Sequence, residues 1–111
     1  MICELAKLSD INASQWYEFS LQLDSGLVSI MLIHKDDKYT AFINSCPHQS
    51  RRMDYAAGQF LISETGSIIC PAHGAEFDSD DGLCINGPCR GQSLTPVQIK
   101  SNEESLFAII K

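Results

Sequence analysis

The sequence predicts an all-β fold of short antiparallel strands. Apolar residues alternate at period two, as in Phe19, Leu21 and Leu23, and this is the periodicity of a strand with one buried face. Turn signals such as Gly26 separate these runs, because glycine reaches positive φ without strain. No segment has a convincing helical period. We therefore expect an antiparallel β-sandwich or barrel as the base of the fold.

The first half of the chain predicts an early strand and then a three-stranded meander. The third strand of the meander runs directly into Cys46, so a loop that begins there hangs from the end of a strand. Polar or glycine-containing turns separate the runs. The expected strands are residues 2–8, 16–23, 27–33 and 39–44, and the expected turns are residues 12–14, 24–26 and 35–38.

The second half predicts shorter strands around a second loop that begins at Cys70. Asn86, Gly87 and Pro88 follow one another, and we expect no regular structure near them. Two longer strands then close the fold. The expected strands are residues 60–62, 67–70, 74–78, 94–100 and 106–110, with turns at residues 64–67, 79–82 and 101–104.

Length and charge limit the classes of function. The chain has 111 residues, which is enough for one small domain, so we expect residues 1–111 to form a single domain. The net charge of −6 argues against nucleic acid as a partner, because nucleic-acid binding selects a basic face. An acidic protein of this size fits a carrier that docks on basic surfaces.

The chain has five cysteines and no secretory signature. Its N-terminus lacks a basic region and a long apolar segment, and the longest apolar run, residues 28–33, is far too short to span a membrane. We therefore expect a cytoplasmic protein with no membrane contact. In a reducing compartment, clustered Cys and His indicate metal or redox chemistry rather than a disulfide framework.

Two short segments carry the metal chemistry. One contains Cys46, Pro47 and His48, and the other runs from Cys70 through Pro71 and Ala72 to His73 and Gly74. Each offers one thiolate and one imidazole. A [2Fe-2S] cluster has two irons that need two protein ligands each, so the two thiolates can bind one iron and the two imidazoles the other. The candidate ligands are Cys46, His48, Cys70 and His73.

These segments resemble the two cluster-binding boxes of Rieske proteins. The similarity covers roughly residues 38–100, and it includes Gly82, the Gly87-Pro88 pair and Leu94. It implies one Rieske-type [2Fe-2S] cluster, and a small cluster-binding subdomain of two loop-bearing hairpins at about residues 45–90. Pro88 is expected in a third loop that covers the cluster. One departure is visible, because the 21 residues between His48 and Cys70 are several more than usual. We expect residues 51–67 to form an excursion away from the cluster.

Within that family the chain resembles soluble, low-potential ferredoxins that serve oxygenases. Position 75 is Ala and position 77 is Phe, where high-potential members have hydroxyl groups near the cluster. Hydroxyl donors stabilise the reduced cluster, so their absence predicts a potential toward the low end of the Rieske range of about −150 to +300 mV. The resemblance implies a monomeric electron carrier, not an enzyme, that takes electrons from a reductase and passes them to an oxygenase or similar terminal enzyme.

Two other interpretations of the same residues stay open. The chain also resembles small Rieske subunits of nitrite reductases, in which the domain is part of a larger complex. Alternatively, the four ligands could form a tetrahedral Cys₂His₂ zinc site in a structural module. Iron analysis and spectroscopy separate zinc from iron, because zinc is colourless and silent in EPR.

The remaining Cys and His have structural interpretations first. Cys84 and Cys89 flank a turn, so they form either a disulfide or redox-labile dithiol, or a pair of small side chains packed beside the cluster loops. We expect Cys3 to be an ordinary strand residue, Trp16 to pack in the core or at its edge, and His34 to be solvated.

Arg51 and Arg52, beside the first segment, are expected to be solvated, and the acidic run after the second segment (Glu76, Asp78, Asp80 and Asp81) fits an ordinary polar turn and a docking patch equally well. Arg51 and Arg52 could also meet an acidic patch of a partner, and the acidic run after the second segment could aid docking on a basic one.

Overall fold

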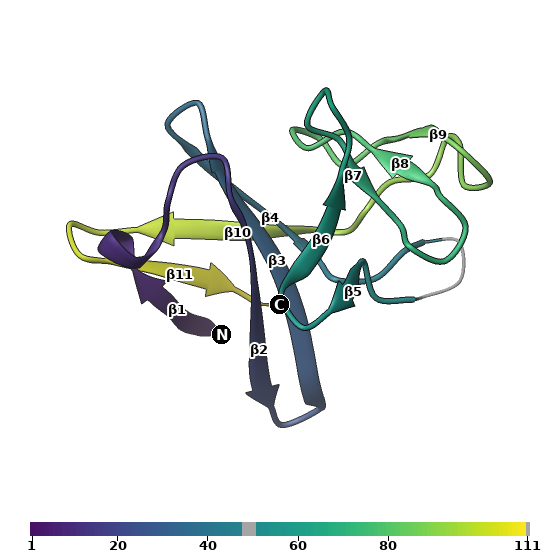
Figure 1. The fold of residues 1–111 in the computed structure, drawn as a ribbon. Coiled ribbons are helices and arrows are strands. Elements are labelled where there is room, and N and C mark those ends of the chain that lie inside the picture. The colour runs from purple at the N-terminus through teal and green to yellow at the C-terminus, as the bar shows by residue number, and fades with distance from the viewer. Residues whose placement is uncertain (48–50, 111) are drawn as a thin grey trace.

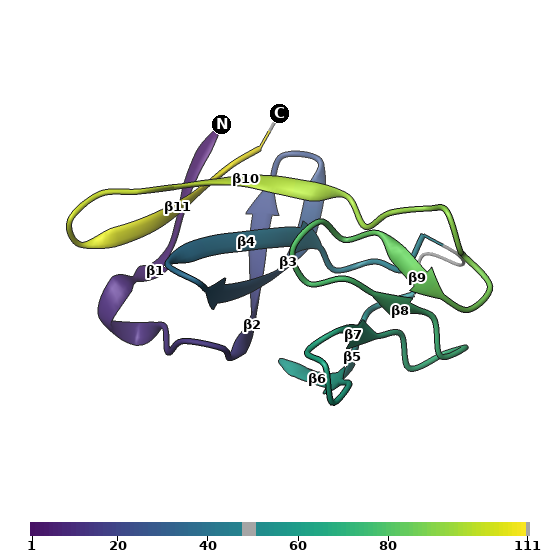
Figure 2. The ribbon, with the colours of Figure 1, turned by 90° about the horizontal axis from the view of Figure 1, so that it is seen from above.

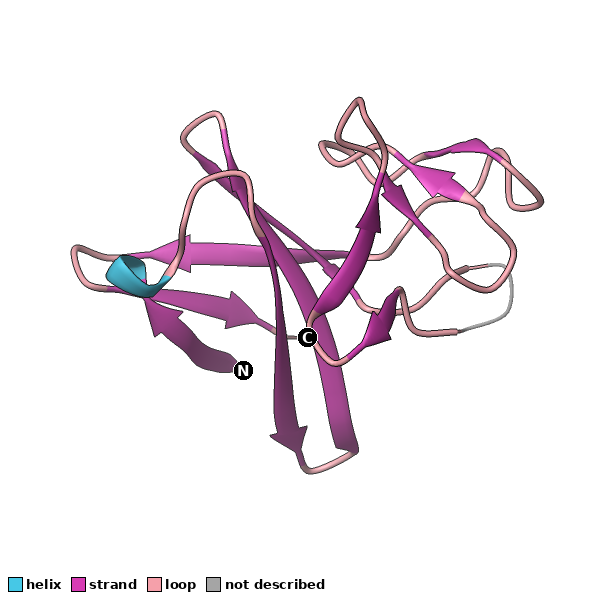
Figure 3. Ribbon diagram, in the orientation of Figure 1, coloured by secondary structure: helices cyan, strands magenta, loops and turns pink. Residues whose placement is uncertain are grey.

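The computed structural model describes residues 1–47 and 51–110, and almost all of its regular structure is β-strand (Figure 3). A short 3-10 helix, η1 (Leu8–Asp10), follows the first strand. The strands are β1 (Ile2–Lys7), β2 (Trp16–Leu23), β3 (Gly26–Lys35), β4 (Lys38–Ile43), β5 (Asp54–Ala56), β6 (Gln59–Ile62), β7 (Ile68–Ile69), β8 (Glu76–Phe77), β9 (Cys84–Asn86), β10 (Pro96–Ser101) and β11 (Ser105–Ile109).

The strands form two antiparallel sheets, which lie side by side in two views (Figures 1 and 2). The first, which we call the base sheet, has six strands in the order β1-β11-β10-β4-β3-β2 and curls toward a barrel. The second, which we call the ligand sheet, has five strands in the order β5-β6-β7-β8-β9. The all-β prediction, with a barrel-like base and a smaller sheet beside it, is confirmed.

Tight turns fix the register of the meander. In the β2–β3 hairpin Leu23 pairs with Gly26, so the turn has two residues between its strands. In the β3–β4 hairpin Lys35 pairs with Lys38, and the two aspartates between them have φ of 53° and 61°. Turns with positive φ match the right-handed twist of the flanking strands, and Asp tolerates this conformation better than most residues.

The central strand β3 is buried on both faces. Ile30 and Leu32 belong to one hydrophobic core, and Met31 and Ile33 belong to the other. Since successive side chains of a strand point to opposite faces, one strand can serve two cores. β4 does the same with Ala41 and Phe42. These two strands are therefore the wall that the base and the ligand region share.

The structure corrects the prediction for the segment around residue 86. Cys84–Asn86 is a strand, and it pairs with β8 so that Phe77 faces Cys84 across the ladder. β5 is also absent from the sequence prediction. Both strands have three residues, which is too short to give a periodic signal, and they exist because neighbouring strands supply the hydrogen bonds.

The prediction of an excursion away from the cluster at residues 51–67 is also wrong. This segment forms the β5–β6 hairpin, and β6 pairs with β7, the strand that enters the second box. Phe60 packs against Trp16 of β2, with ring centroids 5.9 Å apart. Met53 is completely buried in the same core as Cys46 and Cys70. The additional residues therefore build one wall of the ligand region.

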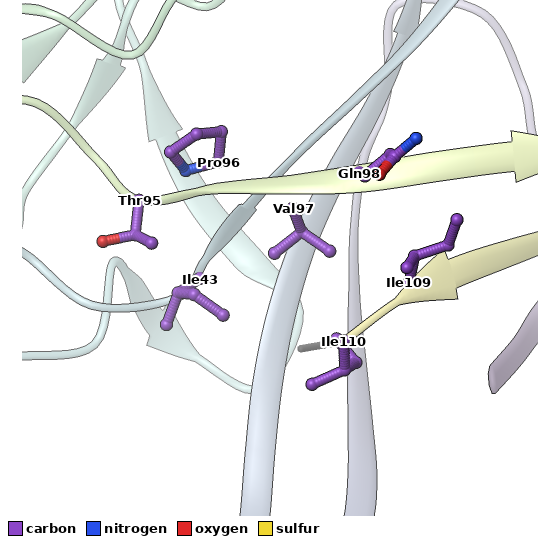
Figure 4. A pocket seen from close by; sticks show the side chains of 7 residues that line it. All are labelled: Ile43, Thr95, Pro96, Val97, Gln98, Ile109 and Ile110. Atoms are coloured by element: carbon purple, nitrogen blue, oxygen red, sulfur yellow. The ribbon is translucent and has the colours of Figure 1, made fainter. Parts of the chain in front are cut away.

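Two further observations bear on function. None of the described helical segments is long and apolar enough to cross a membrane. An open hollow of about 460 Å³ lies on the base sheet between β4, β10 and β11, and it is lined mainly by aliphatic side chains such as Ile43, Val97 and Ile110 (Figure 4). Its lining contains no Cys, His or charged side chain, so it offers no metal-binding chemistry.

Candidate metal centre

The first box follows β4 directly. Cys46 is 2% exposed, and its backbone N–H donates a hydrogen bond of 2.6 Å to the carbonyl oxygen of Arg51. This bond closes the loop on itself, so the thiol is held at the base of a short loop rather than at its tip. Pro47 is half-buried. His48 lies outside the residues that the structure describes.

The side chain of Asn44 ties the two ends of this loop together. Its Nδ2 donates to Asp54 Oδ1 and to Ser29 Oγ, both at 3.1 Å, and its Oδ1 accepts the N–H of Met53 at 2.7 Å. Asn44 is 5% exposed and Asp54 8%, so these bonds are made away from solvent. Buried hydrogen bonds are costly to leave unmade, and the network therefore holds residues 44 and 53 at a fixed separation.

Asp54 is the charged centre of this network. Its carboxylate accepts two hydrogen bonds of 2.9 Å from Arg52, which also lies 3.5 Å from Glu18, and one of 3.2 Å from the N–H of Gly58. Burial alone raises the pKa of Asp54, but the bonds from Arg52, Asn44 and Gly58 outweigh it and lower the pKa to about 2. The group is therefore an anion at neutral pH.

The second box follows β7. The Cys70 N–H donates to the carbonyl of Ala75 at 2.7 Å, and the Gly74 N–H donates to the carbonyl of Cys70 at 2.9 Å. Gly74 has φ of 73°, a conformation that glycine adopts most easily, and this turns the chain back toward β8. Cys70 is 1% exposed, whereas His73 is exposed.

The two boxes therefore place sulfur inside and an imidazole outside. Cys46 and Cys70 lie in one buried core with Ala75 and Phe77, and His73 faces solvent from the same loop as Cys70. Two buried thiols on separate loops and a solvent-facing imidazole fit the asymmetric ligand set of a Rieske cluster. Within residues 1–47 and 51–110, no three Cys, His, Asp or Glu side chains are placed to hold one ion.

A third loop lies against both boxes. A Cβ atom on Gly87 would come within 2.8 Å of the Cα of Ala75, so only glycine fits this approach to the second box. On the other side of Pro88, the thiol of Cys89 contacts Cys84 and Cys46. Burial, with a further contribution from the neighbouring sulfurs of Cys84 and Cys46, raises the pKa of Cys89 to about 12.

Sequence reasoning found the boxes but missed the groups that hold them. Asn44, Met53 and Asp54 were not expected to matter, and a lone polar residue beside a motif gives no signal of its own. Arg52 is exposed, as expected, but it is also paired with Asp54 and Glu18. Arg51 is exposed, as expected.

The predictions for the remaining single residues are mostly confirmed. Trp16 is buried and Cys3 lies in β1. The expectation for His34 is wrong in part, because its ring is half-buried and stacks on Tyr39 with centroids 4.2 Å apart.

Comparison with known proteins points to one family. The family profile described as "Rieske [2Fe-2S] domain" matches residues 3–103. A search of curated proteins found no match.

Among solved structures, the ferredoxin of carbazole 1,9a-dioxygenase from Nocardioides aromaticivorans IC177 aligns with a TM-score of 0.75 at 18% identity, over 100% of this chain and 99% of its own. The chain also aligns with the terminal oxygenase of carbazole 1,9a-dioxygenase from Novosphingobium sp. KA1, with a TM-score of 0.80 at 14% identity. That alignment covers 98% of this chain but 29% of the oxygenase.

A third structure, of a reduced oxygenase in complex with oxidised ferredoxin, aligns with a TM-score of 0.72 at 18% identity. The alignment covers 96% of this chain and 91% of the matched chain. At these identities the similarity shows a shared fold.

Proposed function

The chain belongs to the Rieske [2Fe-2S] domain family, and on that premise we propose that it carries single electrons from a reductase to an oxygenase or similar terminal enzyme. The cofactor of this family is a Rieske-type [2Fe-2S] cluster, which supplies one-electron chemistry. The protein is an electron-transfer component and not a catalyst. Its own residues bind the cluster, keep water from the sulfur side and present the electron to a partner.

Four residues are proposed as ligands. Cys46 and Cys70 hold the inner iron, and His48 and His73 hold the outer one. The observation that carries this proposal is the contrast within the second box, where Cys70 is 1% exposed and His73 is exposed. With buried thiols and exposed imidazoles as ligands, one iron lies in the buried core and the other lies near the surface, where an electron can leave.

The proposed domain organisation follows from the same residues. Residues 1–111 form one Rieske domain, and about residues 45–90 form its cluster-binding subdomain. The two box loops, the ligand sheet and the third loop all fall within that range. The base sheet supplies β3 and β4, on which the subdomain packs.

The exposed end of the second box is the proposed docking face. Pro71, Ala72 and His73 are exposed there, and the neighbouring Tyr55 is 57% exposed. An open hollow of about 450 Å³ lies between Tyr55, Arg51 and the box. A partner surface that covers this end reaches His73 without disturbing the buried thiols.

The proposed potential is low for a Rieske protein. Ala75 and Phe77 are both completely buried in the core that contains Cys46 and Cys70, and neither has a hydroxyl group. Without such donors, less negative charge is stabilised on reduction. Voltammetry is expected to place the potential in the lower part of the range of about −150 to +300 mV, and a value well above +100 mV contradicts this reasoning.

The proposed partners are a reductase as donor and an oxygenase as acceptor, met by a cytosolic monomer. A ferredoxin of this fold is found in a complex with the oxygenase of carbazole 1,9a-dioxygenase, and another matches this chain over 99% of its own length. The similarity to that ferredoxin supports a separate carrier over a subunit of a complex. Co-purification with a large flavin or sirohaem subunit would instead favour the nitrite reductase alternative.

Spectroscopy of the purified protein tests the cofactor and its ligands. We expect iron and no stoichiometric zinc, a red-brown protein, and a rhombic EPR signal that appears only on reduction. Stoichiometric zinc in place of iron overturns the proposal.

Histidine variants provide a matched comparison. His73→Ala and His48→Ala are expected to abolish the Rieske signal, because each removes a proposed ligand. His34→Ala is the control, because its ring stacks on Tyr39 in the β3–β4 hairpin and has no proposed role at the metal. Loss of the signal in all three variants, or in none, contradicts the ligand assignment.

A further inference from the structure

The third loop contains a pair of thiols that the electron-carrier function does not use. Cys84 is the first residue of β9, and Cys89 lies five residues later, beyond Pro88. The two sulfur atoms are 3.0 Å apart, and each residue is 2% exposed. Both residues are outside the proposed ligand set.

We propose that Cys84 and Cys89 are a redox modification site, a dithiol that hydrogen peroxide oxidises to an intramolecular disulfide beside Cys46. In the first step one thiol becomes a sulfenic acid while peroxide is reduced to water. In the second step the other thiol attacks the sulfenic sulfur, the S–S bond forms and a second water leaves. Two thiols and one peroxide thus give one disulfide and two waters, with two electrons transferred.

The backbone already holds the two cysteines opposite one another. The N–H of Cys84 donates to the carbonyl of Gln92 at 2.8 Å, and the N–H of Gln92 donates to the carbonyl of Cys89 at 2.9 Å. The N–H of Arg90 closes the turn on the carbonyl of Gly87 at 3.3 Å. Because disulfides form only where the backbone places the two sulfurs face to face, this fixed turn is what a bridge requires.

Accessibility decides which oxidant can act on the pair. Both thiols are buried, so a tripeptide disulfide such as glutathione disulfide has no room to form a mixed disulfide with either. The turn residues Gly87, Pro88, Arg90 and Gly91 are exposed, so the pair lies only one layer below the surface. A molecule as small as peroxide needs only a local opening of that layer to reach the sulfurs. Burial raises the pKa of Cys89 and keeps its thiol protonated, so the oxidation is expected to be slow.

The position of the pair links it to both boxes. Gly87 lies against Ala75 of the second box, and Cys89 contacts Cys46 of the first. A bridge between Cys84 and Cys89 fixes the loop that touches both. It also removes the thiol hydrogen that Cys89 presents to its sulfur neighbours. The proposal of a disulfide depends only on the positions of the two thiols. The effect of that disulfide on the cluster rests on the proposed function.

Peptide mass spectrometry tests the site directly. The full-length protein as purified is treated with hydrogen peroxide, alkylated under denaturing conditions, and digested with trypsin and an endoproteinase that cuts before Asp. The peptide of residues 81–90 then contains Cys84 and Cys89 and no other cysteine. We expect it unalkylated and lighter by two hydrogen atoms after peroxide, and alkylated twice after a reducing agent is added.

Controls show whether the bridge is specific. Glutathione disulfide at the same concentration is expected to leave the peptide alkylated twice. Cys89→Ser is expected to prevent the loss of two hydrogens, and Cys3→Ser, in β1, to leave it unchanged. The unmodified protein gives the answer even if Cys89→Ser does not fold.

Other outcomes overturn the site. They are two alkylated cysteines after peroxide treatment, a bridge from Cys89 to Cys46, or sulfinic acid on one cysteine alone. The mass readout does not depend on the metal content, so failure of this site and failure of the electron-carrier proposal are told apart by the iron analysis.

Discussion

The base sheet and the ligand sheet use the same antiparallel pairing but strands of very different length. β3 has ten residues and β2 has eight, whereas β7 and β8 have two each. A long strand buries enough side chains to stabilise its own ladder. A two-residue strand does not, so the ligand sheet depends on what it packs against. The ligand sheet therefore depends on the base sheet for its stability, whereas the base sheet does not depend on the ligand sheet.

The sources of order also differ between the two regions. The base core consists of aliphatic side chains such as Ile30, Leu32 and Leu106, which need no specific partner. The ligand region adds four buried cysteines and the Asn44–Asp54 network, whose groups do need partners. Their shared wall, β3 and β4, means that damage to the base reaches the site, whereas damage to the site can leave the base intact.

Removal of the metal is expected to have the largest effect and to separate the two regions. Structural metal sites contribute roughly 10 kcal/mol or more to the free energy of folding, and here the metal would stabilise the shortest strands. After reduction and chelation we expect amide hydrogen exchange to become fast in β7 and β8 and to remain slow in β3 and β10. Equal loss of protection in both sheets contradicts the proposed order of stability.

Truncation of the base core is expected to have the next largest effect and to unfold both regions. Leu32→Ala removes a completely buried side chain and should lower the free energy of unfolding by roughly 2–5 kcal/mol. Denaturation followed by fluorescence of Trp16, which lies in the other core, should shift together with circular dichroism. Leu27→Ala, at a side chain 73% exposed, is the matched control and should change stability by less than about 0.5 kcal/mol.

Neutralising Asp54 is expected to remove a pH-dependent part of the stability. The pKa of Asp54 is lowered from 3.8 to about 2, so its contribution of roughly 2 kcal/mol is present above pH 3.8 and is lost as the pH falls toward 2. Asp54→Asn should flatten the stability profile in that window. Asp24→Asn, in an exposed turn of the base sheet, is the control and should keep the profile of the unmodified protein. An unchanged profile in Asp54→Asn would show that the network is not the acid-sensitive element.

An effect of similar size, reduced to about half in its control, is expected from a methyl group on the third loop. Gly87→Ala places a Cβ 2.8 Å from the backbone of Ala75 at φ of 100°, and should cost roughly 2 kcal/mol in stability. Gly91→Ala is the matched control, since it has a similar φ of 91° and no heavy atom within 4 Å. It should cost about 1 kcal/mol through backbone strain alone. Equal losses in thermal denaturation would show that the approach to Ala75 contributes nothing.

Most of the base could be predicted from the sequence, and less of the ligand sheet could. The strands over residues 16–23 and 39–44 were expected almost as the structure has them, because alternation over several residues is a local signal. β5 and β9 were not expected, because three residues give no period. The additional residues between the boxes were expected to leave the site, but they contribute Met53 and Phe60 to its core.

The sequence by itself determined the all-β class and the type of cluster, since alternation, turn residues and the Cys-His spacing are properties of neighbours along the chain. The assignment of Cys46, His48, Cys70 and His73 as ligands stays a prediction, and His48 also lies outside the described part. The tertiary structure decided which groups hold the first box, how Gly87 reaches Ala75, and that Cys84 and Cys89 lie 3.0 Å apart. These contacts join different segments of the chain, and the sequence of each segment does not show which other segment it will contact. Packing on the shared wall of β3 and β4 brings the segments together.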